Sequence, residues 1–269
     1  MVSLDSQTYR DFEVIVVDQN PDERVVPLLQ RHPGLSIRHL RSARGLSRAR
    51  NTGLPFAKGK IIAFPDDDCW YPKDLLAIVN AWFDDHVEFD GLFSCLCDAD
   101  NNPVGPRWPE RGCLCTKQFI LDRALSTCGF LRRQITDAIG AFDERMGLGA
   151  DSQYQSGEET DYYLRPQKLG FRMWFEPSVR VHHPSLHSPD RLRRSTYSFA
   201  RSSGYVMRAH GFTWWSLATR LTRSMGGALI SLLKGDTGNV IIYLLRSAGL
   251  LRGYVLGPRD MARLSPRQD

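Results

Sequence analysis

The chain has 269 residues, of which 42% are hydrophobic and 24% are charged. This composition excludes an intrinsically disordered chain, and the length suits one large globular domain or one domain with an appendage. The net charge of +5 hides an asymmetry, because residues from Asp190 onward carry 13 Lys/Arg and 4 Asp/Glu (+9), whereas the first 189 carry 22 and 26 (−4). The basic C-terminal part predicts an anionic partner, such as lipid, nucleic acid or a phosphorylated acceptor, or else a solvated face.

Apolar runs and helical patterns alternate over the first third of the chain. The runs typical of buried strands are Phe12–Asp18, Leu35–Leu40 and Lys60–Phe64, and the helical patterns are Val25–Arg31, Leu46–Ala57 and Pro72–Phe83. This alternation predicts an α/β fold with a mostly parallel sheet flanked by helices. Ligands of such sheets bind at the carboxyl ends of the strands, where Asp18 and the acidic triplet Asp66-Asp67-Asp68 fall.

The rest of the chain divides into further strands and a helical C-terminal part. Strands are expected at Phe89–Cys97, Cys113–Phe119 and Gly170–Val181, loops at 98–112 and 143–157, and helices at Ser195–His210 and Trp214–Lys234. We therefore expect a catalytic domain over residues 1–188 and a basic helical region over residues 189–269.

The acidic triplet is the most informative motif. Carboxylates packed at a strand end repel one another unless a cation neutralises them, and Mg²⁺ or Mn²⁺ completed by a substrate diphosphate fits this arrangement. The alternative is a solvated acidic loop that precedes a helix.

A second acidic group, Gly157-Glu158-Glu159-Thr160-Asp161, precedes a helical pattern. Glu158 near a helix N-terminus is stabilised as a carboxylate, and a neighbouring carboxylate can accept a proton from a hydroxyl. The alternative is a set of ordinary capping acids on an exposed turn.

Two basic motifs could contact phosphate or metal. In Arg41–Asn51 we expect Arg44 and Arg48 near a diphosphate, the alternative being a solvated helix face. One histidine of His182-His183-Pro184, at a strand end, could complete a metal shell or touch phosphate, and we assign His183 to the metal; a structural hydrogen bond is the alternative.

The six cysteines include no C-x-x-C pair. Small buried thiols in a reducing compartment explain them better than a zinc site, because the spacing is not the usual one for zinc. We see no signal peptide and no uncharged apolar stretch of about 18 residues.

Three motifs in order resemble a family 2 glycosyltransferase with a GT-A fold: FEVIVVDQN, RGLSRARNTGLPFAKGKIIAFPDDD and GEETDYYLRPQKLGFRMWFEPSVRVHHP. The resemblance covers about residues 4–185. It implies that Asp18 contacts the nucleotide base, and that Asp66 and Asp68 form the DxD-type motif on the sugar-nucleotide and the divalent cation. We expect Asp67 to contact the sugar-nucleotide as well. It also implies an inverting displacement, of hexosyl or rhamnosyl type, in polysaccharide biosynthesis of the cell envelope.

The chain departs from the family pattern in two places. Glu159 stands where the family usually has an aspartate as the general base, which makes Asp161 the backup base. The usual first strand, of the type V-S-V-I-I-P-T-Y-N, has no counterpart, so the catalytic domain is expected to be N-terminally incomplete and weakly active or poorly stable.

The C-terminal region combines short apolar stretches with arginine and aromatic residues. Leu217, Leu221, Leu229, Leu232 and Leu233 recur at mostly helical spacing. This pattern predicts a helix in a membrane interface, which would place the enzyme at the cytoplasmic face of the plasma membrane beside a glycan or lipid-linked acceptor. The alternative is helices packed on the domain or on another subunit.

Two other functions use the same residues. A metal-dependent phosphoesterase or nuclease would release phosphate without a sugar acceptor, although no nucleic-acid partner is expected because aromatic residues are not interleaved along a basic strand. A non-catalytic remnant would bind a nucleotide or a partner without transfer.

Overall fold

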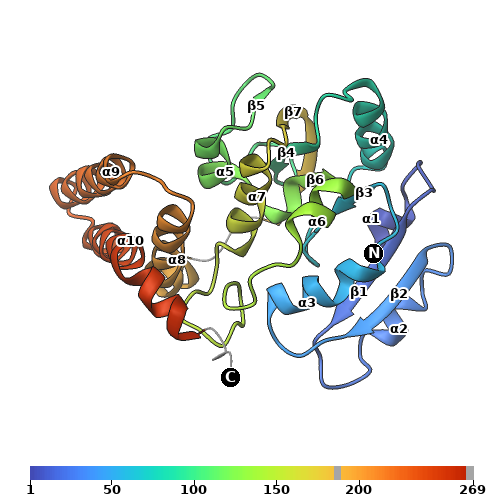
Figure 1. Cartoon of the computed structure of the whole chain (residues 1–269), viewed down its shortest axis with the longest axis horizontal. Helices are drawn as coiled ribbons and strands as arrows, with labels where there is room; N and C mark the ends of the chain where they lie inside the picture. Colours follow the sequence, from blue (N-terminus) through green and yellow to red (C-terminus); the bar gives the residue numbers. More distant parts are fainter. Residues whose placement is uncertain (185–188, 265–269) are drawn as a thin grey trace. The chain divides into compact units, whose positions relative to one another are not determined.

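The computed structural model describes the backbone of residues 1–184 and 189–264, and the side chains of residues 1–184 and 195–259 (Figure 1). The strands are β1 (Glu13–Asp18), β2 (Ser36–Arg41), β3 (Ile61–Ala63), β4 (Gly91–Cys97), β5 (Cys113–Leu114), β6 (Gly129–Arg132) and β7 (Met173–His182). The helices are α1 (Val2–Asp5), α2 (Val26–Leu29), α3 (Leu46–Gly53), α4 (Leu75–Asp85), α5 (Lys117–Arg123), α6 (Arg133–Ile139), α7 (Glu158–Lys168), α8 (Pro189–Ala209), α9 (Trp214–Leu233) and α10 (Thr237–Leu264), with 3-10 turns at Leu54–Phe56 and Ser126–Cys128.

The strands form two sheets. β1 and β2 pair in parallel, and a separate five-stranded sheet has the order β3-β6-β4-β7-β5. The α/β class is confirmed, but the pairing is mixed rather than mostly parallel, since β4–β7 is parallel whereas β3–β6, β4–β6 and β5–β7 are antiparallel. The sequence pattern missed β6, a four-residue strand inserted between β3 and β4.

A glycine allows β6 to enter the sheet. A Cβ atom at Gly129 would lie 2.6 Å from the hydroxyl oxygen of Tyr163 and 3.2 Å from the ring of Phe93. The Tyr163 hydroxyl donates a hydrogen bond to the Ser126 carbonyl at 3.2 Å, so the ring is held against the glycine. Only a residue without a side chain fits this position.

The expected strand at Cys113–Phe119 is wrong over most of its length. β5 ends at Leu114, and Thr116 then caps α5, its side-chain oxygen accepting a hydrogen bond from the Phe119 amide at 3.1 Å. A threonine at this position offers the backbone a helix start, which competes with the strand that the apolar residues suggest.

The apolar core lies around β4, whose seven residues are all buried. β4 is a continuous apolar run because both faces are covered, as in other buried strands. α4 packs with it through one apolar face, and Leu75, Val79 and Phe83 of this helix are each 2% exposed.

The chain divides into two compact units. The first comprises Met1–Arg44, Arg48–Phe142 and Tyr162–Leu186; the second comprises Gly45–Ser47, Asp143–Asp161 and His187–Asp269. The second unit therefore includes the segment from Asp143 to Asp161 as well as the C-terminal helices. The boundary after residue 188 stays a prediction.

The 143–157 segment has no helix or strand, as expected, yet it is tied by hydrogen bonds. The Gly147 amide donates to the Tyr154 carbonyl at 2.9 Å, and the Ser47 hydroxyl donates to the Met146 carbonyl at 2.6 Å. Gly147 has a φ of 100°, a backbone conformation that disfavours other residues.

Candidate active site

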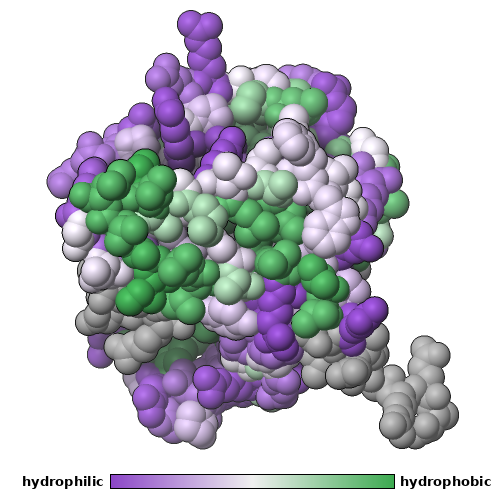
Figure 2. All heavy atoms as spheres, turned by 90° about the vertical axis from the view of Figure 1, so that its left-hand side faces the viewer, coloured by the Kyte–Doolittle hydropathy of each residue, from purple (hydrophilic) through white to green (hydrophobic). Residues whose placement is uncertain are grey.

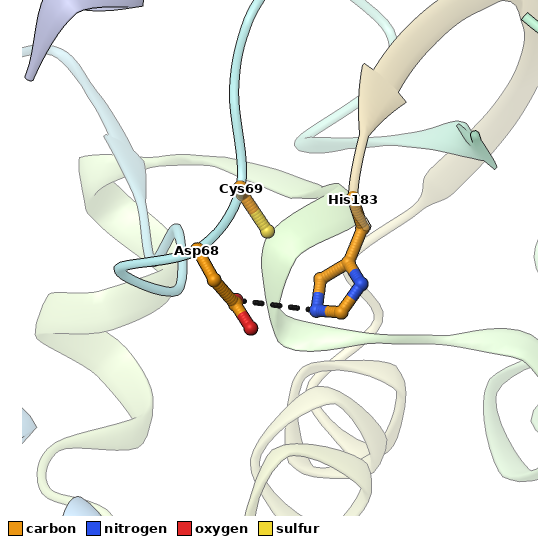
Figure 3. Close-up of side chains that lie close together, drawn as sticks. All are labelled: Asp68, Cys69 and His183. Carbon is orange, nitrogen blue, oxygen red and sulfur yellow. Dashed lines mark ion pairs between the residues drawn. The ribbon is translucent and has the colours of Figure 1, made fainter. Parts of the chain in front are cut away.

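The acidic triplet follows β3, as predicted, and one of its carboxylates meets a histidine from the end of β7. The Asp68 Oδ1 and His183 Nε2 atoms are 3.2 Å apart (Figure 3). Ligand atoms of Asp68, Cys69 and His183 all lie within 4.8 Å of one another. The structure therefore brings together two of the residues predicted to hold the metal.

Backbone pairing explains this meeting. Trp70, just after the triplet, exchanges two hydrogen bonds with His182, at 2.9 and 3.0 Å. The His183 amide donates to the Cys97 carbonyl at 3.0 Å, which fixes the end of β7 against the end of β4. The His182 ring nitrogen Nδ1 lies 2.9 Å from the Asp98 carbonyl oxygen, so His182 has a structural partner while the neighbouring His183 reaches Asp68.

Cys69 is a member of this cluster that the sequence did not suggest. Burial, together with the negative charges of Asp66 and Asp68, raises the pKa of the Cys69 thiol to about 12. A neutral thiol is a poor ligand for a hard cation, so Asp68 and His183 are the groups available to bind Mg²⁺ or Mn²⁺.

The other carboxylates of the triplet differ in exposure. Asp67 is exposed, whereas Asp66 is half-buried and lies 3.8 Å from the guanidinium of Arg50. Arg50 is itself buried and lies over the Phe142 ring at 5.2 Å from its centroid. Burial of Arg50 beside a carboxylate was not apparent in the sequence, where Arg44 and Arg48 were the expected phosphate contacts.

Arg44 and Arg48 lie on the exposed and half-exposed surface at the start of α3. The Arg48 Nη1 atom donates to the Arg44 carbonyl at 3.3 Å. Their role toward phosphate stays a prediction.

Asp18 ends β1 and is buried with its own set of partners. Its carboxylate accepts hydrogen bonds from the backbone and side-chain amides of Asn20 at 2.8 and 2.7 Å, and lies 3.3 Å from His39 and 3.0 Å from Arg41. Burial alone would raise the pKa of Asp18, but the Asn20 and His39 hydrogen bonds and the Arg41 charge outweigh it and hold the pKa below its usual value.

This depressed pKa predicts how Asp18 contributes to stability. A carboxyl group with a lowered folded-state pKa stabilises the protein above its unfolded pKa of about 3.9, and that contribution is lost as pH falls through the folded value. The free energy of unfolding of wild type minus that of Asp18→Asn, both measured with urea, should therefore be largest above about pH 4 and decrease below it. The exposed Asp100→Asn is the control, and a difference that grows toward low pH would contradict the assignment.

The second acidic group begins α7, where the structure separates its members. Glu158 is 4% exposed, whereas Glu159 is half-exposed at the first turn of the helix. Asp161 lies 2.7 Å from the Nε2 atom of His210, a residue that follows α8 and is 4% exposed. The pairing of Asp161 with His210 could not be predicted from the sequence, because no motif near His210 indicates such a contact.

Residues 1–140, more than half of the 269, match the model of glycosyl transferase family 2. The chain belongs to glycosyl transferase family 2. The uncharacterized glycosyltransferase YibD of Escherichia coli (strain K12) is 28% identical over 113 residues, which are 40% of this family 2 chain and 32% of YibD. The match thus spans about a third of that relative.

Solved structures share the fold of this family 2 chain. TarS of S. aureus has a TM-score of 0.58 at 15% identity, over 94% of this chain and 50% of TarS. The mannosyltransferase PcManGT of Pyrobaculum calidifontis, solved with GDP-Man and Mn²⁺, has a TM-score of 0.59 at 16% identity, over 94% of this chain and 81% of PcManGT. These likenesses confirm the GT-A-like fold class.

Proposed function

We propose that the chain transfers a sugar, of hexosyl or rhamnosyl type, from a nucleotide-sugar donor to a hydroxyl group of a glycan or lipid-linked acceptor, with inversion. The observation that carries the proposal is the meeting of Asp68 and His183 at the ends of β3 and β7 in a chain of this family. A nucleoside diphosphate sugar as donor is supported by solved structures of similar fold that hold UDP-GlcNAc or GDP-Man.

The residues present fit a divalent cation. The Asp68 carboxylate and the His183 imidazole would hold it. Asp66, also predicted to hold the cation, is outside this cluster and lies 3.8 Å from Arg50, and Asp67 is exposed. A cation bound there supplies charge neutralisation for the departing diphosphate. We favour Mn²⁺ over Mg²⁺ because an imidazole nitrogen is a better ligand for a transition metal than for magnesium.

Glu159 is the proposed general base. Its half-exposed carboxylate at the start of α7 can accept the proton of an acceptor hydroxyl, whereas Glu158 is buried. Asp161 is hydrogen-bonded to His210, which suits a residue that holds the acidic segment in place better than one that exchanges protons with an acceptor.

We infer the cellular location from where the donor and the acceptor are found. A peripheral protein at the cytoplasmic face of the plasma membrane would have access both to cytoplasmic nucleotide-sugars and to lipid-linked acceptors of the cell envelope. The basic charge of the chain from Asp190 onward supports a location on an anionic membrane surface.

Donor hydrolysis across UDP-, GDP- and TDP-sugars tests the proposed function. Wild type should release nucleoside diphosphate from one donor in a Mn²⁺-dependent manner. Asp68→Asn should raise the Mn²⁺ concentration for half-maximal rate by at least about tenfold, since even outer-shell partners of a metal contribute roughly 10- to 100-fold. Asp85→Asn, at the exposed end of α4, is the control and should change nothing.

Other outcomes of this assay would identify the alternatives. Phosphate release from simple phosphoesters without any sugar donor would indicate a phosphoesterase. Nucleotide binding without turnover, for every donor and cation, would indicate a non-catalytic protein.

A further inference from the structure

In the C-terminal half of helix α9 the buried residues are small and the large apolar residues are exposed, whereas Leu217 near its start is buried. The buried residues Ser224, Ala228 and Ser231 face inward, while Met225, Leu229 and Leu233 are exposed. A helix that packs on a water-soluble core shows the opposite arrangement, with large apolar side chains on the buried face. Small residues at helix contacts and large apolar ones outside are typical of helices surrounded by lipid.

The contact between α8 and α10 is also formed by small residues. Gly249, Gly253 and Gly257 recur at intervals of four on α10, and a Cβ atom at Gly253 would overlap the Arg201 carbonyl of α8. From the other side, a Cβ at Gly204 of α8 would overlap the Leu250 carbonyl. The two backbones are therefore in direct contact, as in small-residue packing between membrane helices.

A tight connection joins α9 to α10. The Gly235 amide donates to the Leu232 carbonyl at 3.0 Å and the Asp236 amide donates to the Ser231 carbonyl at 2.9 Å, which is a Schellman motif. Asp236 then accepts a hydrogen bond from the Asn239 amide at 3.0 Å and caps α10. The Ser224 hydroxyl donates to the Tyr243 carbonyl at 2.9 Å, which fixes the two helices against each other.

The outer faces of both helices carry exposed apolar stripes, which we call the α9–α10 face. Its large members, all exposed, are Trp214, Trp215, Met225, Leu229, Ile230, Leu232, Leu233, Ile241, Leu244, Leu251 and Val255. Figure 2 looks onto the side on which α9 and α10 are drawn in Figure 1 and shows large hydrophobic areas next to hydrophilic ones. An apolar surface of this extent indicates an interaction site.

Charge indicates which partner fits. From Thr213 to Arg259 the chain has six basic residues and one acidic residue, Asp236. Among the basic residues, Arg223, Lys234, Arg246 and Arg252 are exposed. Exposed arginine and lysine beside apolar residues and tryptophan match the anionic headgroups and the acyl boundary of a bilayer, whereas two copies of one positive surface would repel each other.

One helix also meets a length and hydropathy criterion for a membrane span. Thr237–Arg259 has 23 residues, is long and apolar enough to cross a membrane by length and composition, and is mostly not buried inside the protein. Arg246 and Arg252 lie within it and are exposed, and a charged side chain at the centre of a bilayer is costly. A helix lying in the interface keeps these arginines at the headgroups.

We propose that the α9–α10 face is a docking surface for an anionic lipid bilayer, with both helices in the plane of the interface. The inference rests on the proposed function in one respect: docking would bring a lipid-linked acceptor to the enzyme. Binding to the bilayer itself requires no catalysis.

Flotation of the full-length protein with vesicles tests the proposal. Wild type should float with vesicles that contain phosphatidylglycerol and much less with vesicles of phosphatidylcholine alone. Leu229→Glu and Leu233→Glu should each weaken binding by about tenfold or more, because the burial of a leucine in lipid is lost. Arg223→Gln and Arg246→Gln should each weaken binding about fivefold, and only to anionic vesicles.

Matched controls lie elsewhere on the chain. Leu169 is 57% exposed and Val87 is 79% exposed, against 58% for Leu229 and 80% for Leu233. Leu169→Glu and Val87→Glu should leave vesicle binding unchanged, and circular dichroism should show that all the variants are folded.

Three outcomes would overturn the docking surface: no binding of wild type, equal losses in the control variants, or an oligomer in sedimentation that Leu229→Glu and Leu233→Glu dissociate. The last would assign the face to a second copy of this chain. Vesicle binding without any sugar transfer would leave this inference standing and reject the proposed function instead.

Discussion

Glu159→Gln is expected to lower the rate of sugar transfer by about 10²- to 10⁴-fold, the usual contribution of a positioned general base. Glutamine keeps the size and hydrogen-bonding shape of the half-exposed side chain at the start of α7 but cannot accept the acceptor's proton. The loss should fall on turnover, because the base acts on the acceptor hydroxyl and not on the donor. Steady-state rates with a nucleotide-sugar and a lipid extract, together with the affinity for UDP or GDP, separate these effects.

Two neighbours serve as controls for Glu159. Glu158→Gln alters a buried side chain and should lower stability more than turnover. Asp161→Asn disturbs the contact with His210, so His210→Ala should reproduce its effect. If Asp161→Asn abolishes transfer, His210→Ala does not, and Glu159→Gln stays active, the base is Asp161, and our assignment is wrong.

Gly253→Ala is expected to destabilise the packing of α8 on α10 by about 1–3 kcal/mol, the usual cost of overpacking. Alanine favours a helix over glycine by about 1 kcal/mol, so local propensity alone predicts the opposite sign. The cost of overpacking should exceed the gain in helix propensity, because the added methyl group would overlap the Arg201 carbonyl and lie 2.9 Å from the Tyr205 nitrogen. These are backbone atoms, which cannot rotate away.

Gly226→Ala is the matched control on α9. A Cβ atom there meets nothing within 4 Å, so this variant should gain about 0.5–1 kcal/mol from helix propensity. Hydrogen exchange of the amides of α8 and α10 measures the local effect without assuming that the two compact units unfold together. Equal effects of the two substitutions would show that the helices do not approach as closely as the structure has them.

Much of the candidate site was predictable because short sequence patterns identify its residues. An apolar run that ends in carboxylates places Asp18 and the triplet at strand ends, and this holds in the structure for β1 and β3. The expected burial of the first strand is wrong, because the residues of β1 before Asp18 are only half-buried. His183 was predictable for the same reason, since it follows β7 directly. The roles of Glu159, Arg44 and Arg48 rest on the resemblance and on local pattern, and they stay predictions.

Other residues of the site are not identified by any sequence pattern around them. Cys69 joins Asp68 and His183 only because the bridge between Trp70 and His182 brings the two strand ends together. Arg50 is buried beside Asp66, with its guanidinium 5.2 Å from the centroid of the Phe142 ring, whereas Arg48 on the same helix is half-exposed.

By itself, the sequence determined the α/β class, the family and the positions of the acidic strand ends, because alternating apolar runs and short motifs act over a few neighbouring residues. Only the tertiary structure decided the antiparallel insertion of β6 between β3 and β4, and the contact of Asp161 with His210, 49 residues away. It also decided which face of α9 is outside: helical spacing shows that a stripe exists, but not whether the large or the small residues face the neighbouring helix. That choice depends on how closely two backbones can approach. Here the glycines of α8 and α10 and the small residues of α9 allow an approach that leaves Leu229, Leu232 and Leu233 exposed.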